Sequence, residues 1–342
     1  MFLAHPQNTL SEKFISLPKA ELHLHLEGSI QPLTASALGA AHGIAICEEE
    51  VRQRYAYRDF SEFIETFKWV TSLLRGPRDY ALILRDLGEQ LLAQHIVYTE
   101  LTLSVGVMLL RGQNVQANFA ALFEASKPFL SRGLRFNFIF DAVRQFGAGA
   151  AMKVVDCAKQ CNSQSIVAFG IGGDELSIPA NEFRAVYDHA AAIGLHRSMH
   201  AGEIGGPQEI RDAIELLGVE RIGHGIAAIH DPALMDLLAE RRIPLEVCPQ
   251  SNIRTGALAR QLHLPSATIQ QHPLPRLFQH GIPILLGSDD PAMFETDLLS
   301  EFQNARNMGI SEQQLTRLAA NSFEHAFLNS RDREMLQRPR QL

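Results

Sequence analysis

The stretch Ser198-Met-His-Ala-Gly-Glu203 ends an apolar run with a histidine and, three residues later, a carboxylate. Far upstream, Ala20-Glu-Leu-His-Leu-His25 holds two histidines two residues apart, and in a β-strand this spacing points both rings to the same side. Far downstream, Ile284-Leu-Leu-Gly-Ser-Asp-Asp290 ends another apolar run in two adjacent carboxylates. Histidines and an aspartate at the ends of separate strands are the ligand types of a catalytic zinc that leaves room for water.

Short apolar segments alternate along the chain with amphipathic segments of helical length. The predicted strands span residues 19–26, 96–103, 134–140, 165–171, 195–200, 221–224, 243–248 and 281–287. Strands that alternate with helices imply right-handed crossovers and a parallel sheet, and eight such units over about 300 residues predict an α/β fold, a closed (β/α)₈ TIM barrel. A doubly wound open sheet is the alternative.

The barrel can be tested within the sequence, because active groups in this fold collect at the C-terminal ends of the strands. The candidate residues that fall at or near such ends are His23, His25, His200, His224, Asp289 and Asp290. Histidines scattered through a core would not show this bias.

The segment 31–75 reads as helical and carries the aromatic residues Phe60, Phe63, Phe67 and Trp69. We expect it to pack onto the barrel as a helical flap inserted after the first strand, so that residues 1–342 form a single domain. The C-terminal run 331–342 is polar and broken by a proline, and we expect it to fray.

The bulk composition favours a small-molecule substrate. The net charge is −7, the pI is about 6.1, and the chain has no block of basic residues. Electrostatic binding to nucleic acid or to an acidic membrane is therefore disfavoured. No apolar run approaches the roughly 20 residues needed to span a bilayer, and Met1 to Ser16 lacks the apolar core of a signal peptide. Four cysteines without a paired framework favour a reducing cytoplasm. A homo-oligomer is compatible with this composition.

The candidate residues permit a hydrolytic reaction. Zinc held by imidazoles and a carboxylate lowers the pKa of a coordinated water and so supplies hydroxide at neutral pH. An aromatic ring must be protonated as hydroxide attacks it, and Glu203 is the candidate acid. His224, flanked by two glycines, is the candidate base or electrostatic partner, and Asp290 is placed to face the substrate.

At these residues the sequence resembles the adenosine deaminase family of metal-dependent amidohydrolases. The resemblance covers nearly the whole chain in order and rests on Leu17-Pro-Lys-Ala-Glu-Leu-His-Leu-His-Leu-Glu-Gly28, Gly172-Gly-Asp-Glu175, Met199-His-Ala-Gly-Glu203, Arg221-Ile-Gly-His-Gly225, Cys248-Pro-Gln-Ser-Asn252 and Ser288-Asp-Asp-Pro291. It implies a (β/α)₈ barrel with one zinc per chain, and its implied zinc ligands are His23, His25, His200 and Asp289.

The resemblance also implies a role for each remaining site residue. Glu203 would protonate the purine N1, His224 would orient the attacking hydroxide, Asp290 would bond N7, and the backbone at Gly173 would meet N3. The product would be the 6-oxo purine plus ammonia. The expected substrate contacts are His25, Glu27, Gly173, Asp290 and Arg144.

The breadth of the family that the sequence resembles places adenosine first as the expected substrate, with aminodeoxyfutalosine and then adenine as alternatives. Glu27 stands where many adenosine deaminases carry an aspartate, and residues 287–294 look more like relatives acting on adenine or aminodeoxyfutalosine. The segment 172–175 and Gly223 look like the nucleoside branch. Arg144, a lone basic residue after the third strand, could pair with the aryl carboxylate of aminodeoxyfutalosine. AMP should be a poor substrate, because a phosphate is normally bound by several positive groups and Arg144 stands alone.

Other classes fit less well. A dinuclear amidohydrolase would use a lysine at the end of the fourth strand, but Phe169-Gly-Ile-Gly172 has none. The His-x-Glu and Pro-Cys-x-x-Cys motifs of cytidine-type deaminases do not occur. A non-catalytic zinc-binding protein is disfavoured, because both Glu203 and His224 are present.

Overall fold

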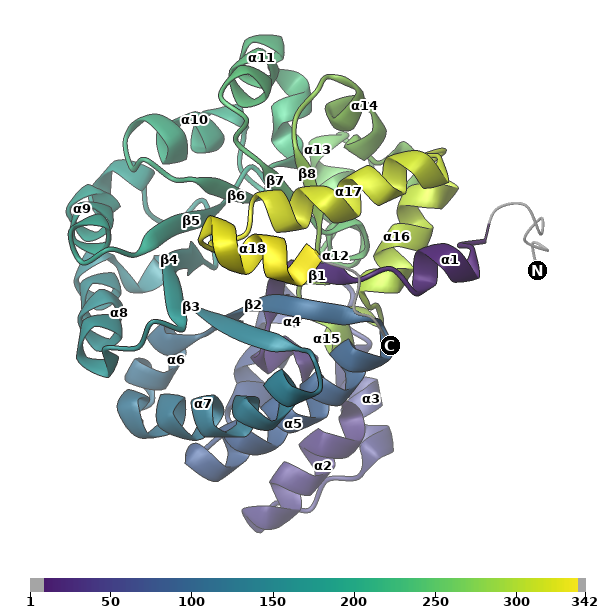
Figure 1. Ribbon diagram of the computed structural model, residues 1–342. Helices are drawn as coiled ribbons and strands as arrows, with labels where there is room; N and C mark the ends of the chain where they lie inside the picture. Colours follow the sequence, from purple (N-terminus) through teal and green to yellow (C-terminus); the bar gives the residue numbers. More distant parts are fainter. Residues whose placement is uncertain (1–8, 338–342) are drawn as a thin grey trace.

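The computed structural model describes residues 9–337 and shows a ring of parallel strands surrounded by helices (Figure 1). The strands are β1 (Lys19–His25), β2 (Ile96–Leu103), β3 (Arg135–Val143), β4 (Ile166–Gly172), β5 (His196–Ala201), β6 (Arg221–His224), β7 (Leu245–Val247) and β8 (Ile284–Leu286). Each strand pairs in parallel with the next in sequence. The predicted (β/α)₈ barrel and its eight strands are therefore confirmed.

The ring closes between β1 and the residues that follow β8. Leu24 and Asp289 form a parallel bridge, in which the His25 N–H donates to the Asp289 carbonyl at 2.8 Å and the Asp289 N–H donates to the His23 carbonyl at 3.1 Å. This closure carries the carboxylate of Asp289 to the side of the two histidines of β1.

Helices lie outside the strands and cover them. Four helices, α2 to α5, lie between β1 and β2, and the first three of them occupy the segment 31–75 that was expected to be helical. The helices are α1 (Glu12–Ile15), α2 (Pro32–Ala41), α3 (Glu48–Tyr55), α4 (Phe60–Thr71), α5 (Pro77–Ala93), α6 (Val105–Leu110), α7 (Val115–Ser131), α8 (Ala148–Cys161), α9 (Arg184–Ala192), α10 (Pro207–Glu215), α11 (Pro232–Glu240), α12 (Pro249–Arg254), α13 (Ala257–Gln261), α14 (Leu274–Gln279), α15 (Pro291–Phe294), α16 (Leu298–Asn307), α17 (Glu312–Glu324) and α18 (Ser330–Gln337).

The C-terminal helices α17 and α18 lie across the strands in the view of Figure 1. Phe323 and Ala326 pack there in an apolar cluster with residues near the starts of strands, among them Ala20 and Tyr98. Residues 331–337, which we expected to fray, form most of α18, and Arg135 pairs with Asp332 at 2.7 Å. Residues 338–342 lie outside the described chain. The N-terminal end of the barrel is thus covered, and the opposite end carries the cavity described below.

A column of charged groups crosses the barrel interior. The Arg221 guanidinium is 1% exposed and pairs with Glu100 and Glu246, both at 2.6 Å. The other carboxylate oxygen of Glu246 lies 2.7 Å from His23 Nδ1. At the far end, the backbone N–H of Phe327 donates to Glu100 at 2.6 Å, and the Phe327 ring lies 3.7 Å from the Arg221 guanidinium carbon. We call these five residues the polar column.

No helix among residues 9–337 combines the length and the apolar character needed to cross a membrane.

Glu301 gives a testable pH dependence of stability. This α16 side chain is fully buried and accepts hydrogen bonds from the Thr296 hydroxyl at 2.6 Å, the Gln250 N–H at 3.2 Å and the Asn304 amide at 3.3 Å. Burial raises the pKa of Glu301 from 4.5 to about 7. The folded state therefore binds the proton of the Glu301 carboxyl more tightly than the unfolded state does. Ionisation of Glu301 lowers the free energy of unfolding as the pH rises from about 4.5 to about 7 and above.

A glutamine at position 301 keeps the shape and does not ionise. We expect the unfolding free energy of Glu301→Gln, relative to the unchanged protein, to increase by about 1–3 kcal/mol between about pH 5 and pH 8. Urea unfolding of both proteins at both pH values measures this difference. A difference that is the same at the two pH values would contradict the prediction.

Candidate active site

A cavity opens at the C-terminal ends of the strands, as the barrel architecture predicts. Its volume, including the open mouth, is about 860 Å³. Residues that end or follow each of the eight strands line it together with one side of α4. The predicted site residues among its lining are His25, Gly173, His200, Glu203, His224, Asp289 and Asp290.

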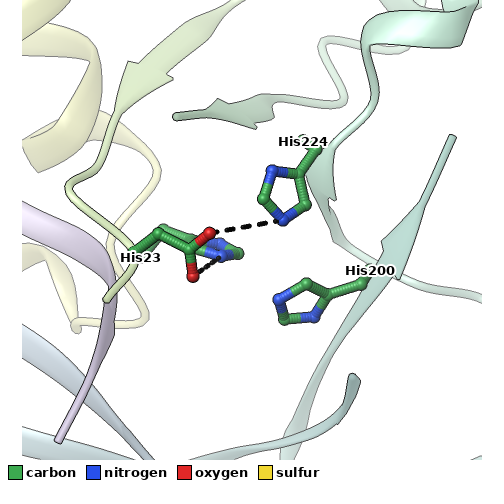
Figure 2. Close-up of side chains that lie close together, drawn as sticks. His23, His200 and His224 are labelled. Atoms are coloured by element: carbon green, nitrogen blue, oxygen red, sulfur yellow. Dashed lines mark ion pairs between the residues drawn. The ribbon is translucent and has the colours of Figure 1, made fainter. Parts of the chain in front are cut away.

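Four side chains place metal-type donor atoms close together beside this cavity. The donors of His23, His200, His224 and Asp289 all lie within 4.8 Å of one another, and Figure 2 shows the three imidazoles around one space. His23 Nε2 is buried and has no hydrogen-bond partner. Imidazole nitrogens with a carboxylate are a donor set that suits a divalent metal, so these residues fit the predicted ion.

His25 lies at the edge of this group. Its Nε2 atom is 3.4 Å from Asp289 Oδ1, and its ring centre is 5.4 Å from that of His200. The compact donor group therefore contains His224, whereas the predicted ligand set contains His25. His25 still lies close to the carboxylate of Asp289. Both His224 and Asp289 take left-handed backbone conformations, with φ of 59° and 63°. Such strained conformations of non-glycine residues are typical of functional sites.

Neighbouring side chains orient the donors. Glu246 bonds His23 Nδ1 and so leaves Nε2 to face the group. The Ser251 hydroxyl donates to Asp289 at 2.6 Å, and the Asn252 amide lies 3.2 Å from His224 Nδ1.

The protonation states of the histidines differ. Burial lowers the pKa of His200 and of His224 to about 3, which keeps both imidazoles neutral. Burial also lowers the pKa of His23, but the nearby carboxylates of Asp289 and Glu246 outweigh it and raise that pKa to about 10. Neutral imidazoles are the form that binds a metal, so at His23 metal binding must displace a proton.

Glu203 follows β5 and faces the cavity with 6% of its surface exposed. One carboxyl oxygen lies 3.5 Å from His224 Nε2, and the other accepts from the Thr255 hydroxyl at 3.4 Å. Burial, reinforced by the negative charges of Asp289 and Glu175, raises the pKa of Glu203 well above its usual range. This shift favours the protonated form of the side chain, which is the form that a proton donor to a substrate needs.

Asp290 also lines the cavity, and one of its carboxyl oxygens is buried without a hydrogen-bond partner. Burial and the adjacent Asp289 raise the pKa of Asp290 well above its usual range. A Cβ at Gly28 would lie 1.7 Å from Asp290 Oδ1. The glycine that ends the first histidine motif is thus required because Asp290 occupies the space where a side chain would be.

Two expected substrate contacts lie outside the cavity lining. Glu27 is buried, and both oxygens of its carboxylate lie 3.2–3.3 Å from the backbone N–H of Ser104, which itself lines the cavity. Arg144 is 1% exposed and donates to the Ile178 carbonyl at 2.7 Å and to Glu209 at 2.6 Å. The structure therefore does not bring Arg144 to the cavity, because its guanidinium is held by these two partners.

The sequence did not single out Asp141, which lies in the buried part of β3 and lines the cavity. Its carboxyl occupies space left by two glycines of β4: a Cβ at Gly170 would lie 2.8 Å from one oxygen, and a Cβ at Gly172 would lie 3.3 Å from the other. The strand-end rule could have found Asp141, because it directly follows the predicted strand 134–140. Lys68 of α4 is a second lining residue without an expected role.

Aromatic rings form one wall of the cavity. Phe60, Phe63 and Phe67 of α4 line it together with Phe294, and the rings of Phe63 and Phe294 stack with centres 5.0 Å apart. Trp69 is not part of this wall and instead lies against Arg54, whose guanidinium carbon is 4.6 Å from the ring.

This barrel, with its histidine and carboxylate site at the C-terminal ends of the strands, is the architecture of the metal-dependent amidohydrolases. The family model for adenosine deaminase matches residues 18–338. The chain therefore belongs to the adenosine deaminase family and is a hydrolytic deaminase that acts on purine-type substrates.

Individual relatives carry two different names. The chain is 36% identical to an aminodeoxyfutalosine deaminase from Streptomyces coelicolor, over 92% of this chain and 81% of the relative. It is 34% identical to an adenine deaminase from the same organism, over 93% of this chain and 92% of the relative. Among solved structures, an adenine deaminase from Arthrobacter aurescens superposes with a TM-score of 0.87 at 28% identity, over 94% of this chain and 97% of that one.

Proposed function

We propose that the protein is a zinc-dependent deaminase that converts a 6-aminopurine nucleoside to the 6-oxo nucleoside and ammonia. The observation that carries this proposal is the Glu203 carboxyl, whose pKa burial raises and which lies beside a group of metal-type donors in one cavity. One zinc would be held by His23, His25, His200 and Asp289. The ion would activate water as the nucleophile at neutral pH.

The side chains of the cavity would carry out the remaining steps. Glu203 donates its proton to the purine N1 as C6 is attacked, so that negative charge does not build up on the ring. His224, 3.5 Å from Glu203, orients the attacking oxygen. Asp290 bonds N7, and the Gly173 backbone, with φ of 99°, meets N3. The C6–N bond then breaks: the hydroxyl added at C6 gives up its proton and becomes the 6-oxo group, and the amino group takes up that proton and leaves as ammonia.

For the substrate, we place aminodeoxyfutalosine before adenosine and adenine. The aromatic wall of Phe60, Phe63, Phe67 and Phe294 offers apolar surface that the aryl group of aminodeoxyfutalosine could cover and that adenosine would leave in contact with water. A relative named for that substrate supports the same order. Lys68, at the same wall, takes over from Arg144 as the candidate partner of the aryl carboxylate.

A spectrophotometric screen of aminodeoxyfutalosine, adenosine, adenine and AMP tests the proposal. We expect kcat/KM for aminodeoxyfutalosine to exceed that for adenosine by more than about tenfold, which corresponds to about 1.4 kcal/mol of transition-state binding. A preference for adenosine or adenine would overturn the substrate order. The absence of ammonia release from every 6-aminopurine would overturn the proposed reaction.

Lys68→Met tests the carboxylate contact. Because an exposed ion pair contributes little, we expect kcat/KM for aminodeoxyfutalosine to fall by about two- to fivefold while that for adenosine stays unchanged. Lys127→Met is the matched control, since both lysines are exposed and pair with a glutamate three residues earlier on a helix. Equal losses for the two substrates would remove Lys68 from carboxylate recognition.

A further inference from the structure

The proposed reaction leaves Glu175 without a role, although it ends the segment 172–175, one of the motifs that carry the family resemblance. Glu175 follows β4 and is 2% exposed. Its carboxylate does not point into the cavity but accepts three successive backbone N–H groups: those of Glu203 at 3.4 Å, Ile204 at 2.7 Å and Gly205 at 2.5 Å. We call residues 203–205 the acid loop.

The carbonyl groups of the acid loop are held from the opposite side by α13. The amide of Gln261 donates to the Glu203 carbonyl at 2.9 Å and to the Gly205 carbonyl at 2.7 Å. Arg260 donates to the carbonyl between them, that of Ile204, at 3.0 Å. Every backbone N–H and C=O of the acid loop therefore bonds a side chain from another part of the barrel.

These side-chain hydrogen bonds satisfy the backbone groups that a helix or strand would otherwise pair. The acid loop lies after β5 ends at Ala201 and before α10 begins at Pro207, and it belongs to no helix or strand. Its packing is also tight: a Cβ at Gly205 would lie 2.8 Å from Glu209 Cγ and 3.2 Å from Glu175 Oε2. The position of the Glu203 backbone is thus set by Glu175 and Gln261 and not by a regular element.

We infer that Glu175 and Gln261 are positioning residues that aim the Glu203 carboxyl at the substrate. The inference rests on the proposed role of Glu203 as the acid. A proton donor must reach its acceptor within hydrogen-bond distance, and a displacement of about 1 Å can cost about 100-fold in rate. Glu175 and Gln261 would act through Glu203 and make no contact with substrate.

Glu175→Gln tests the inference. The amide oxygen keeps part of the bonding, but the amide NH₂ group cannot accept from a backbone N–H, so the acid loop shifts. We expect kcat to fall by about 10- to 100-fold with KM changed by less than about threefold, because a misplaced acid weakens the transition state more than the bound substrate. Metal content should match that of the unchanged protein.

A double-mutant cycle separates positioning from a general structural role. In a Glu203→Gln background no proton donor is left to aim, so adding Glu175→Gln should change the residual turnover by less than about twofold. The same loss in both backgrounds would overturn the inference while leaving the proposed function intact. If Glu203→Gln alone keeps near-normal turnover, the proposed acid fails instead, and the two failures are thereby distinguished.

Two further variants guard against misfolding and against simple loss of charge. Gln261→Met removes the two bonds on the carbonyl side with little change of shape, and it should give the same kcat loss and the same non-additivity with Glu203→Gln. Glu209→Gln removes a neighbouring carboxylate that pairs with Arg144 and bonds no backbone N–H of the acid loop, so its turnover should stay within about twofold of normal. A loss in Glu209→Gln as large as that in Glu175→Gln would contradict the positioning role.

Discussion

Glu203→Gln should lower kcat by about 10²- to 10⁴-fold, the usual contribution of a positioned general acid. Glutamine has nearly the same shape and can still accept from the Thr255 hydroxyl, but it has no acidic proton to give to the purine N1. Because the variant alters the transition state more than the ground state, KM should change far less than kcat.

Steady-state assays on metal-analysed protein measure this effect. The metal content should equal that of the unchanged protein, which separates loss of the acid from loss of the ion. Turnover close to normal would move the proton donor elsewhere in the cavity, with Asp290 the first candidate, since burial and Asp289 raise the pKa of its carboxyl as well.

His200→Ala should lose both the metal and the activity. His200 belongs to the donor group of the structure and to the ligand set that the sequence predicts, and a vacated ligand position in a site of this kind typically costs much of the metal affinity. We expect the purified variant to hold well under half an equivalent of zinc and to lose at least about 10³-fold in turnover. Elemental analysis together with the deaminase assay measures both.

The companion variants His25→Ala and His224→Ala decide the remaining ligand. If His25 binds the metal, His25→Ala loses zinc, while His224→Ala keeps zinc and loses turnover. The reverse result would assign His224 to the ion, in agreement with the compact donor group. Two equivalents of metal in the fully active protein would contradict the mononuclear site.

The strands could be predicted because the alternation of apolar and amphipathic segments in the sequence matches the alternation of strands and helices in the barrel. Short apolar segments separated by amphipathic helices leave few topologies open, and the predicted β2 and β6 have the observed bounds. The strands β7 and β8 are shorter than predicted chiefly at their starts: they begin two and three residues later, at Leu245 and Ile284, directly after Pro244 and Pro283. The strand-end rule then located the candidate site residues, since the carboxyl ends of all eight strands meet on one side of a barrel.

The misplacement of Arg144 shows where sequence reasoning stops. Its position after β3 was predicted, but the partner that holds its guanidinium, Glu209, lies 65 residues away on α10. The direction in which a long side chain turns depends on such distant partners, which no local pattern contains. The same holds for Glu175 and Glu246, whose hydrogen bonds to Ile204 and His23 connect different strand ends.

The polar column links the two ends of the barrel. Substitution of Phe327 removes the ring contact to Arg221, and a truncation before this residue also removes the backbone N–H that donates to Glu100. Arg221 pairs with Glu100 and with Glu246, the carboxylate that holds the His23 ring. Substitutions or truncations in the segment between α17 and α18 should therefore appear first as weaker zinc retention in a folded protein. A mutational screen for activity would detect residues between α17 and α18 although they do not touch substrate. A chelator titration would then show that their substitution weakens zinc binding.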